Sequence, residues 1–110
     1  MPIEKWSDDV AVVHLANDPQ FTDDLESLEA AIGKSRMNVV LEFGGVHSIN
    51  SSNIARLLKL RKLMSVNASR LLLCNINTRV WGAFLITGLD KIFEVTDNVP
   101  TALATLQIAK

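Results

Sequence analysis

The chain has 110 residues, of which 48% are apolar and 21% charged, a composition typical of one folded globular domain with a single core. Its 11 basic and 12 acidic residues give a net charge of −1, which excludes a general electrostatic attraction for nucleic acid or anionic lipid. Acidic residues concentrate in the first third and basic residues follow later, so two faces of opposite sign, suited to a protein partner, can form.

The first two predicted strands form a hairpin. Residues 10–15 are rich in β-branched side chains, and Asp8-Asp9 just before them suits a turn. Residues 3–6 and 10–15 are therefore expected to pair. Residues 17–19, Asn-Asp-Pro, then end the second strand.

A helix is predicted next, with Thr22 as its cap and its end near Ser35. Acidic residues in its first turn suit a helix N-terminus. Its apolar residues recur at spacings of four, three and four, the pattern of one buried helix face: Phe21, Leu25, Leu28 and Ile32.

Residues 38–43 are predicted to form a buried strand that ends in a turn at Gly44-Gly45. A polar loop over 47–53 leads into a helix over 54–64. Arg61 falls inside the apolar stripe of this helix, where its stem can pack on the core or where a partner can dock. The stripe consists of Ile54, Leu57, Leu58, Leu60 and Met64.

A further buried strand is predicted at 70–75, followed by a helix that Asn77 caps and Gly88 ends. Residues 91–95 are predicted to form a short strand.

Asp97 or Asn98 is expected to cap a last helix, on which Val99, Leu103 and Leu106 keep helical spacing. The predicted order is ββαβαβαβα over a single domain, residues 1–110. This alternation indicates an α/β fold, with a small, mainly parallel or mixed sheet of about four to five strands packed by helices.

The sequence lacks the common motifs of enzymes and metal sites. It has neither of the glycine-rich loops GxxxxGK[ST] and GxGxxG that cradle phosphates. His14 and His47 are the only histidines, and Cys74 is the only cysteine, so an intrachain disulfide and a zinc site are not expected. Ser51 follows His47 by four residues, which is weak support for a nucleophile and its base. We therefore predict no catalytic residue, no metal and no cofactor.

Two apolar residues have distinct expected roles. Cys74 is expected to be a small buried hydrophobic residue. Trp81 is expected either to pack in the core or to lie partly exposed on a binding surface.

Residues 48–53, Ser-Ile-Asn-Ser-Ser-Asn, are the segment of the sequence that says most about function. A serine at the start of a helix lies near free backbone N–H groups, and the helix dipole there favours negative charge. Phosphorylation would add about two negative charges and change partner binding while leaving the fold intact. The alternative interpretation is that these Ser and Asn residues only cap the helix.

In this order, the segments resemble the STAS domain family (sulfate transporter and anti-sigma factor antagonist), above all the bacterial anti-sigma factor antagonists. The resemblance runs from about Val10 to Leu106. Residues 48–53 occupy the place of the last six positions of the family motif [ST]-x-[IM]-D-S-[ST]-G, after a strand over 38–46 that resembles the family's strand. The other matching blocks are residues 57–63, 70–75 and 87–93.

The resemblance implies a protein-binding module that regulates transcription by partner switching. In the family, an anti-sigma factor that is also a serine kinase phosphorylates the serine after the motif's Asp. The unphosphorylated antagonist binds that factor and frees the sigma factor. By position the phosphoacceptor is Ser51, with Ser52 as the alternative, and the implied partner-binding residues are Asn50, Ser51, Ser52, Asn53, Arg56 and Lys59.

Within residues 48–53, two residues depart from the family motif: Asn50 replaces its Asp, and Asn53 replaces its Gly. Losing the Asp charge beside the acceptor weakens kinase recognition. It favours the alternative of a non-switching STAS scaffold in a stress-signalling complex, or of a subunit of a membrane transporter system. Asn tolerates the left-handed backbone that the family's glycine permits, but a helical position is expected for Asn53.

The chain has no apolar run of the signal-peptide type and no stretch approaching ~20 apolar residues, so we expect a cytoplasmic protein without direct membrane insertion. An anti-sigma factor or similar kinase is the expected partner, nucleic acid is not, and a homo-oligomer remains open. A small enzyme or nucleotide-binding protein is a third hypothesis, which rests only on polar loops at strand ends.

Overall fold

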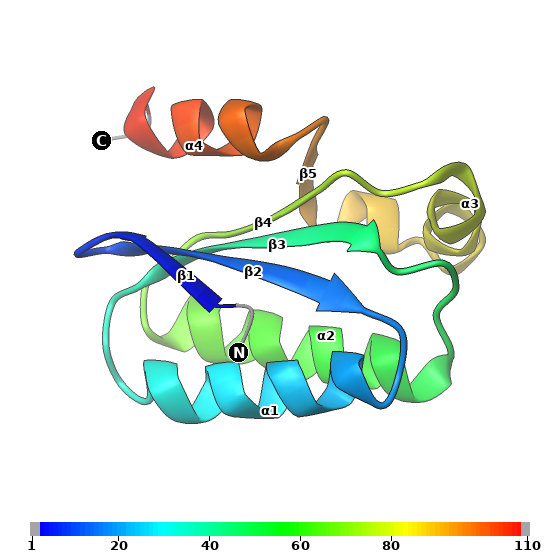
Figure 1. Cartoon of the computed structure of the whole chain (residues 1–110), viewed down its shortest axis with the longest axis horizontal. Coiled ribbons are helices and arrows are strands. Elements are labelled where there is room, and N and C mark those ends of the chain that lie inside the picture. The colour runs from blue at the N-terminus through cyan, green and yellow to red at the C-terminus, as the bar shows by residue number, and fades with distance from the viewer. Residues whose placement is uncertain (1–2, 109–110) are drawn as a thin grey trace.

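A computed structural model describes residues 3–108 (Figure 1). It contains a five-stranded sheet, four α-helices and one turn of 3-10 helix. In chain order these are β1 (Ile3–Ser7), β2 (Val10–Ala16), α1 (Gln20–Ile32), β3 (Asn38–Gly45), α2 (Ser51–Val66), β4 (Leu71–Cys74), α3 (Thr78–Thr87), η1 (Leu89–Lys91), β5 (Glu94–Thr96) and α4 (Val99–Ile108).

The strands lie in the sheet in the order in which they occur in the chain, β1-β2-β3-β4-β5. β1 pairs with β2 antiparallel, and every later pair is parallel. Helices connect the parallel strands, as such crossovers require. The mixed sheet and the order ββαβαβαβα confirm the predicted fold class.

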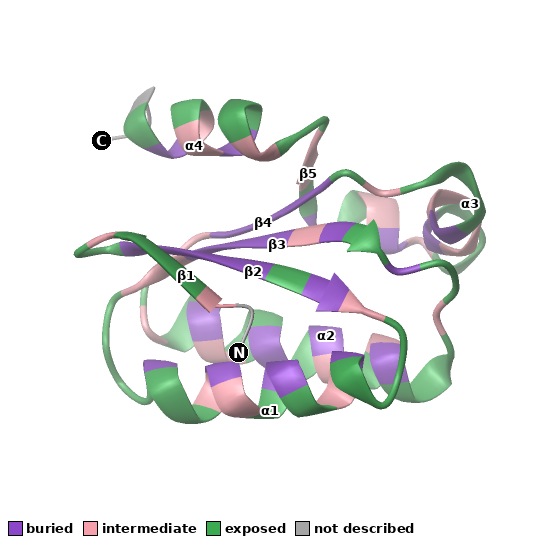
Figure 2. Cartoon of the chain, viewed as in Figure 1, coloured by how far each residue is buried: buried purple, intermediate pink, exposed green. Residues whose placement is uncertain are grey.

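Helices cover both faces of the sheet. In Figure 1, α1 and α2 lie side by side below it, and α4 lies above it. Because side chains alternate along a strand, β3 serves both layers: Val39 and Leu41 pack with α1 and α2, and Val40 packs with α4. Figure 2 shows the buried stripes of α1 and α2 turned toward the sheet. The predicted face of α1, with Phe21 and Leu25 among its residues, is buried as expected.

The predicted start of α1 was wrong. The helix begins at Gln20, so Thr22 lies inside its first turn. Asp18 takes the role predicted for Thr22, because its Oδ1 accepts hydrogen bonds from the backbone N–H of Thr22 (3.0 Å) and from its hydroxyl (2.7 Å). The helix ends at Ile32, short of Ser35, since Gly33 follows with φ +52°, a conformation that ends helices.

Two other elements start three residues away from their predicted starts. α2 begins at Ser51 rather than at residue 54, because Asn50 caps it. The strand predicted at 91–95 begins only at Glu94, since η1 and its i to i+3 hydrogen bonds occupy the chain before it. Asn77 caps α3 as predicted, and Gly88 ends it in a left-handed conformation.

Of Asp97 and Asn98, the two residues predicted to cap the last helix, Asn98 is the cap, because its Oδ1 accepts from the N–H of Thr101 (2.9 Å). Among residues 3–108, no helix has the length and apolar character needed to cross a membrane.

Candidate functional site

The candidate site lies where β3 passes into α2, at the carboxyl end of the parallel strands (Figure 1). The chain turns close to its neighbours here. A Cβ on Gly45 would approach the carbonyl oxygen of Leu15 to 2.8 Å, so only glycine fits without a shift of the backbone. Asn77 supports the loop between β3 and α2, since its side-chain amide donates to the carbonyl of Val46 (2.9 Å). The end of β2 and the cap residue of α3 thus fix the path of the chain between β3 and α2.

A reciprocal capping box starts α2. Asn50 has an extended backbone, and its Oδ1 accepts from the N–H of Asn53 (2.9 Å). In return, Oδ1 of Asn53 accepts from the N–H of Asn50 (3.0 Å). Two of the otherwise unpaired donors at the helix start are satisfied in this way. The capping interpretation therefore holds for Asn50 and Asn53.

Asn53 also connects α2 to the loop between β2 and α1. Its side chain is buried, and its Nδ2 donates to Oδ2 of Asp18 (2.8 Å). Hydrogen bonds from Thr22, then from Asn53, hold the pKa of Asp18 below its ordinary value. Asn53 occupies the helical position expected for it. Its hydrogen bonds are to Asn50 and Asp18, so it holds the start of α2 in place instead of presenting a polar group to solvent.

Ser51 and Ser52 occupy the first turn of α2 and are both exposed. Within residues 3–108, neither hydroxyl takes part in a hydrogen bond. Their backbone N–H groups have no partner within the helix, because the first residues of an α-helix lack the preceding carbonyls. Both hydroxyls are therefore accessible to a reagent or an enzyme, at a helix end that favours negative charge.

Arg56 and Lys59 follow on the next turns of α2 and are paired with α1. Arg56 Nη1 lies 3.3 Å from Glu29 Oε1, and Lys59 Nζ lies 3.6 Å from Glu29 Oε2. Glu26 lies 3.9 Å from Arg56 Nη2. The charged residues of α1 are all acidic and those of α2 all basic, and these contacts pair the two helices. Ser52, Ala55, Arg56 and Lys59 line a shallow depression of about 300 Å³ beside this network.

His47 and Ser51 show no contact of the kind that a nucleophile and its base require. The backbone N–H of His47 donates to Oδ1 of Asn17 (2.9 Å), which fixes the loop before α2. Cys74 is buried, and burial together with the charge of Glu42 raises the pKa of its thiol to about 11. Among residues 3–108, no three His, Cys, Asp or Glu side chains gather in a way that could hold a metal ion.

A cluster around His14 was not found from the sequence. His14 Nδ1 lies 3.0 Å from Glu42 Oε1, and His14 Nε2 lies 2.9 Å from Glu4 Oε1. These bonds, the one with Glu42 first, raise the pKa of His14. Burial raises the pKa of Glu42, but hydrogen bonds from Asn75, His14 and the Gly44 N–H together bring it below its ordinary value. The only available signal was one polar residue inside each of two otherwise apolar predicted strands, His14 and Glu42.

Comparisons with known proteins agree on the fold. The STAS domain family matches residues 12–102 of this chain. A candidate anti-sigma factor antagonist from Thermotoga maritima has a similar structure, with a TM-score of 0.82 and 19% identity over 96% of this chain and 93% of that one. The anti-sigma factor antagonist SpoIIAA in its unphosphorylated form has a TM-score of 0.81 and 17% identity, covering 96% and 94%.

A serine-to-glutamate variant of RsbS from Moorella thermoacetica is also similar, with a TM-score of 0.80 and 21% identity over 100% of both chains. At such identities these structures establish a shared fold. No curated protein sequence matches the chain.

Proposed function

We propose, since the chain belongs to the STAS domain family, that it is a protein-binding module of the anti-sigma factor antagonist type. It regulates transcription by partner switching and acts by binding rather than by catalysis. Its partner is an anti-sigma factor that is also a serine kinase, and both proteins work in the cytoplasm. Phosphorylation of Ser51 controls the interaction.

The exposed Ser51 in the first turn of α2 is the observation that carries this proposal. The capping box of Asn50 and Asn53 holds the helix start without using either serine hydroxyl. A phosphate on Ser51 would gain the free N–H groups of the first turn and the favourable end of the helix dipole. The modification would therefore change the charge of the surface without dismantling the fold.

The partner-binding surface in this proposal consists of the exposed start of α2 and its next two turns. Asn50, Ser51 and Ser52 are exposed, and Lys59 is exposed farther along the helix. Glu29 partly neutralises the positive charge of Arg56 and Lys59. The roughly two negative charges of a phosphate on Ser51 would therefore change the electrostatic potential of this surface strongly. Like-charge contacts with a complementary partner surface would then weaken the complex.

Labelling by the cognate kinase tests the site. With ATP, wild type should gain one phosphate, which mass spectrometry of peptides places on Ser51. Ser51→Ala should lose the label, and the matched variant Ser52→Ala should keep it. Equal labelling of Ser51→Ala would show that the acceptor is wrongly assigned.

Asn50 supports a second candidate function, a non-switching STAS protein. Its amide caps α2 as the family's Asp would, but it carries no charge beside Ser51. A scaffold in a stress-signalling complex, or a subunit of a membrane transporter system, needs the fold and not the phosphate. Genes for a kinase and a sigma factor beside this one would support the first function, and a transporter operon would support the second.

A further inference from the structure

A second surface lies beyond the carboxyl ends of β4 and β5, against α3. A depression of about 310 Å³ is lined there by Ile76, Trp81, Val95, Thr96 and Asp97. Ligands of α/β folds commonly bind at the carboxyl ends of parallel strands. The lining combines an indole, two aliphatic side chains, one threonine and one carboxylate, and no cationic residue contributes to it.

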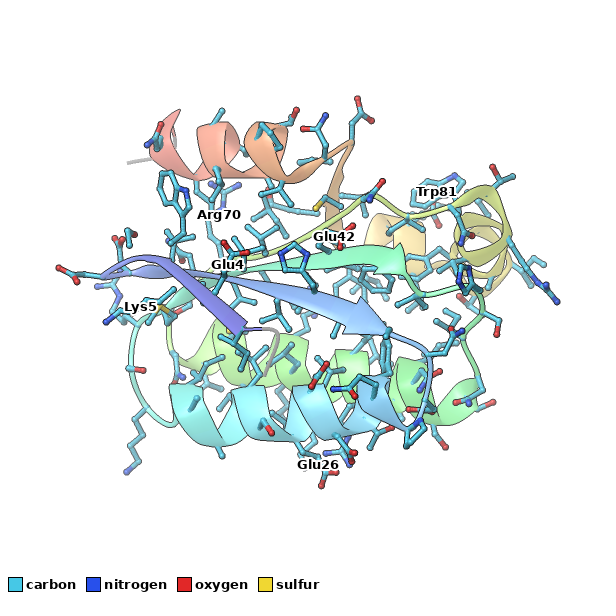
Figure 3. All side chains as sticks on the ribbon, in the orientation of Figure 1. Glu4, Lys5, Glu26, Glu42, Arg70 and Trp81 are labelled. Carbon is cyan, nitrogen blue, oxygen red and sulfur yellow. The ribbon has the colours of Figure 1, made fainter. Side chains whose placement is uncertain are left out.

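The indole of Trp81 is held firmly. Its ring stacks on Phe84 with centroids 6.1 Å apart and planes 24° from parallel. Phe84 is itself fully buried and contacts the rings of Phe43 and Phe93. Trp81 is half-buried and projects from α3 on the side of the molecule that carries α4 (Figure 3). A rigid aromatic surface therefore faces the depression. Because the Trp81 side chain is already ordered, binding a ligand there costs little side-chain entropy.

Asp97 brings an unneutralised charge to the same depression. Its side chain is exposed and forms no hydrogen bond or ion pair within residues 3–108. Its backbone is fixed, because its carbonyl accepts from the N–H of Asn75 (3.1 Å). Arg79 precedes Trp81 by two residues, which on a helix places it about 200° away, on the opposite side of α3. The charge of Asp97 thus remains open to an external cation.

We propose that this depression binds an arginine side chain of a partner protein. The planar guanidinium can stack on the indole of Trp81 and donate hydrogen bonds to the carboxylate of Asp97. The aliphatic stem of the arginine then packs on Val95 and Ile76. The inference rests on the proposed function only in naming a protein as the source of the arginine.

Other ligand classes fit this lining less well. An anion would meet the carboxylate of Asp97 with no cation to balance it. A wholly apolar group would cover that carboxylate without giving it a partner, which costs free energy. A lysine ammonium could pair with Asp97 but is not planar and is more strongly hydrated, so it would stack less well on Trp81.

Proton–nitrogen correlation NMR tests the inference without any partner protein. The probe is arginine blocked at both ends, and the matched neutral probe is blocked citrulline, which has nearly the same shape. Blocked arginine should shift the indole N–H signal of Trp81 saturably, in the millimolar range. Trp6 on β1 is the internal control, since it is 48% exposed and lies with Asp9 in a separate depression, so it shows whether any indole near a carboxylate responds. Blocked citrulline should leave both signals nearly unchanged.

Asp97→Asn should weaken the binding of blocked arginine about threefold, as expected for one exposed ion pair. Asp8→Asn, which removes an equal charge from the turn between β1 and β2, should bind as wild type does. Equal shifts with arginine and citrulline, equal shifts of Trp6 and Trp81, or an unchanged affinity in Asp97→Asn would each overturn the proposal. Because the probe is a small molecule, these results are independent of whether Ser51 is phosphorylated.

Discussion

The amide of Asn53 donates a hydrogen bond to the carboxylate of Asp18 across 2.8 Å, and this bond ties the start of α2 to the loop before α1. The same side chain closes the capping box with Asn50. The motif that residues 48–53 resemble has glycine at this position, and glycine has no side chain to form either bond. Asparagine here thus gives the helix that carries Ser51 an anchor of its own.

Asn53→Gly should lower the free energy of unfolding by about 1–2 kcal/mol, because it removes a cap and a buried hydrogen bond. Urea unfolding followed by circular dichroism measures the change. Ser52→Gly is the matched control, since it adds the same backbone freedom one residue away without breaking a bond. Equal losses in the two variants would mean that the bonds of Asn53 contribute nothing beyond helix propensity.

The cluster of His14, Glu42 and Glu4 should make stability depend on pH. The folded-state pKa of His14 is raised, so its contribution is complete below its ordinary value of 6.5 and is lost as pH rises through the raised value. The folded-state pKa of Glu42 is lowered, so its contribution is present above its ordinary value of 4.5 and is lost as pH falls through the lowered value. The cluster therefore stabilises the fold most between these two values.

His14→Gln should flatten the loss of stability above neutral pH, as measured by urea unfolding over a pH series. His47→Gln is the control, because the hydrogen bond of His47 comes from its backbone and not from its ring. A profile of His14→Gln that coincides with that of wild type would contradict the pairing of His14 with the two carboxylates.

Cys74 should be unreactive in the folded protein. Its side chain is buried in β4 and its thiol pKa is about 11, so thiolate is scarce at mildly alkaline pH. A chromogenic disulfide reagent should react with it slowly in buffer and rapidly in denaturant. Rapid reaction in buffer would show that β4 opens readily, or that the packing of α4 over it is incomplete.

The elements of the fold could be predicted because each depends on a local pattern. The spacing of Phe21 and Leu25 indicated a helix, and the apolar runs at 38–43 and 70–75 indicated strands. The caps of α3 and α4 were predicted, but that of α1 was not, since Asp18 rather than Thr22 accepts the hydrogen bonds in its first turn. Sequence spacing alone could not show these bonds.

The candidate site was predictable only in part. The motif around Ser51 indicated the start of a helix, but the role of Asn53 depends on a contact with a residue 35 positions away. The His14 cluster was missed for the same reason, because Glu4, His14 and Glu42 meet only once the register of three strands is fixed. The depression beside Trp81 likewise joins α3 to the end of β5.

A pull-down from the native cytosol, read by mass spectrometry, tests the central claim most directly. It compares wild type, Ser51→Asp and Ser65→Asp, the last of which adds the same charge to an exposed serine at the other end of α2. Partner switching predicts that wild type and Ser65→Asp capture one protein with a serine kinase domain and that Ser51→Asp loses it. Capture of the same partners by all three would contradict the switch and leave a STAS domain whose binding does not depend on the charge at Ser51.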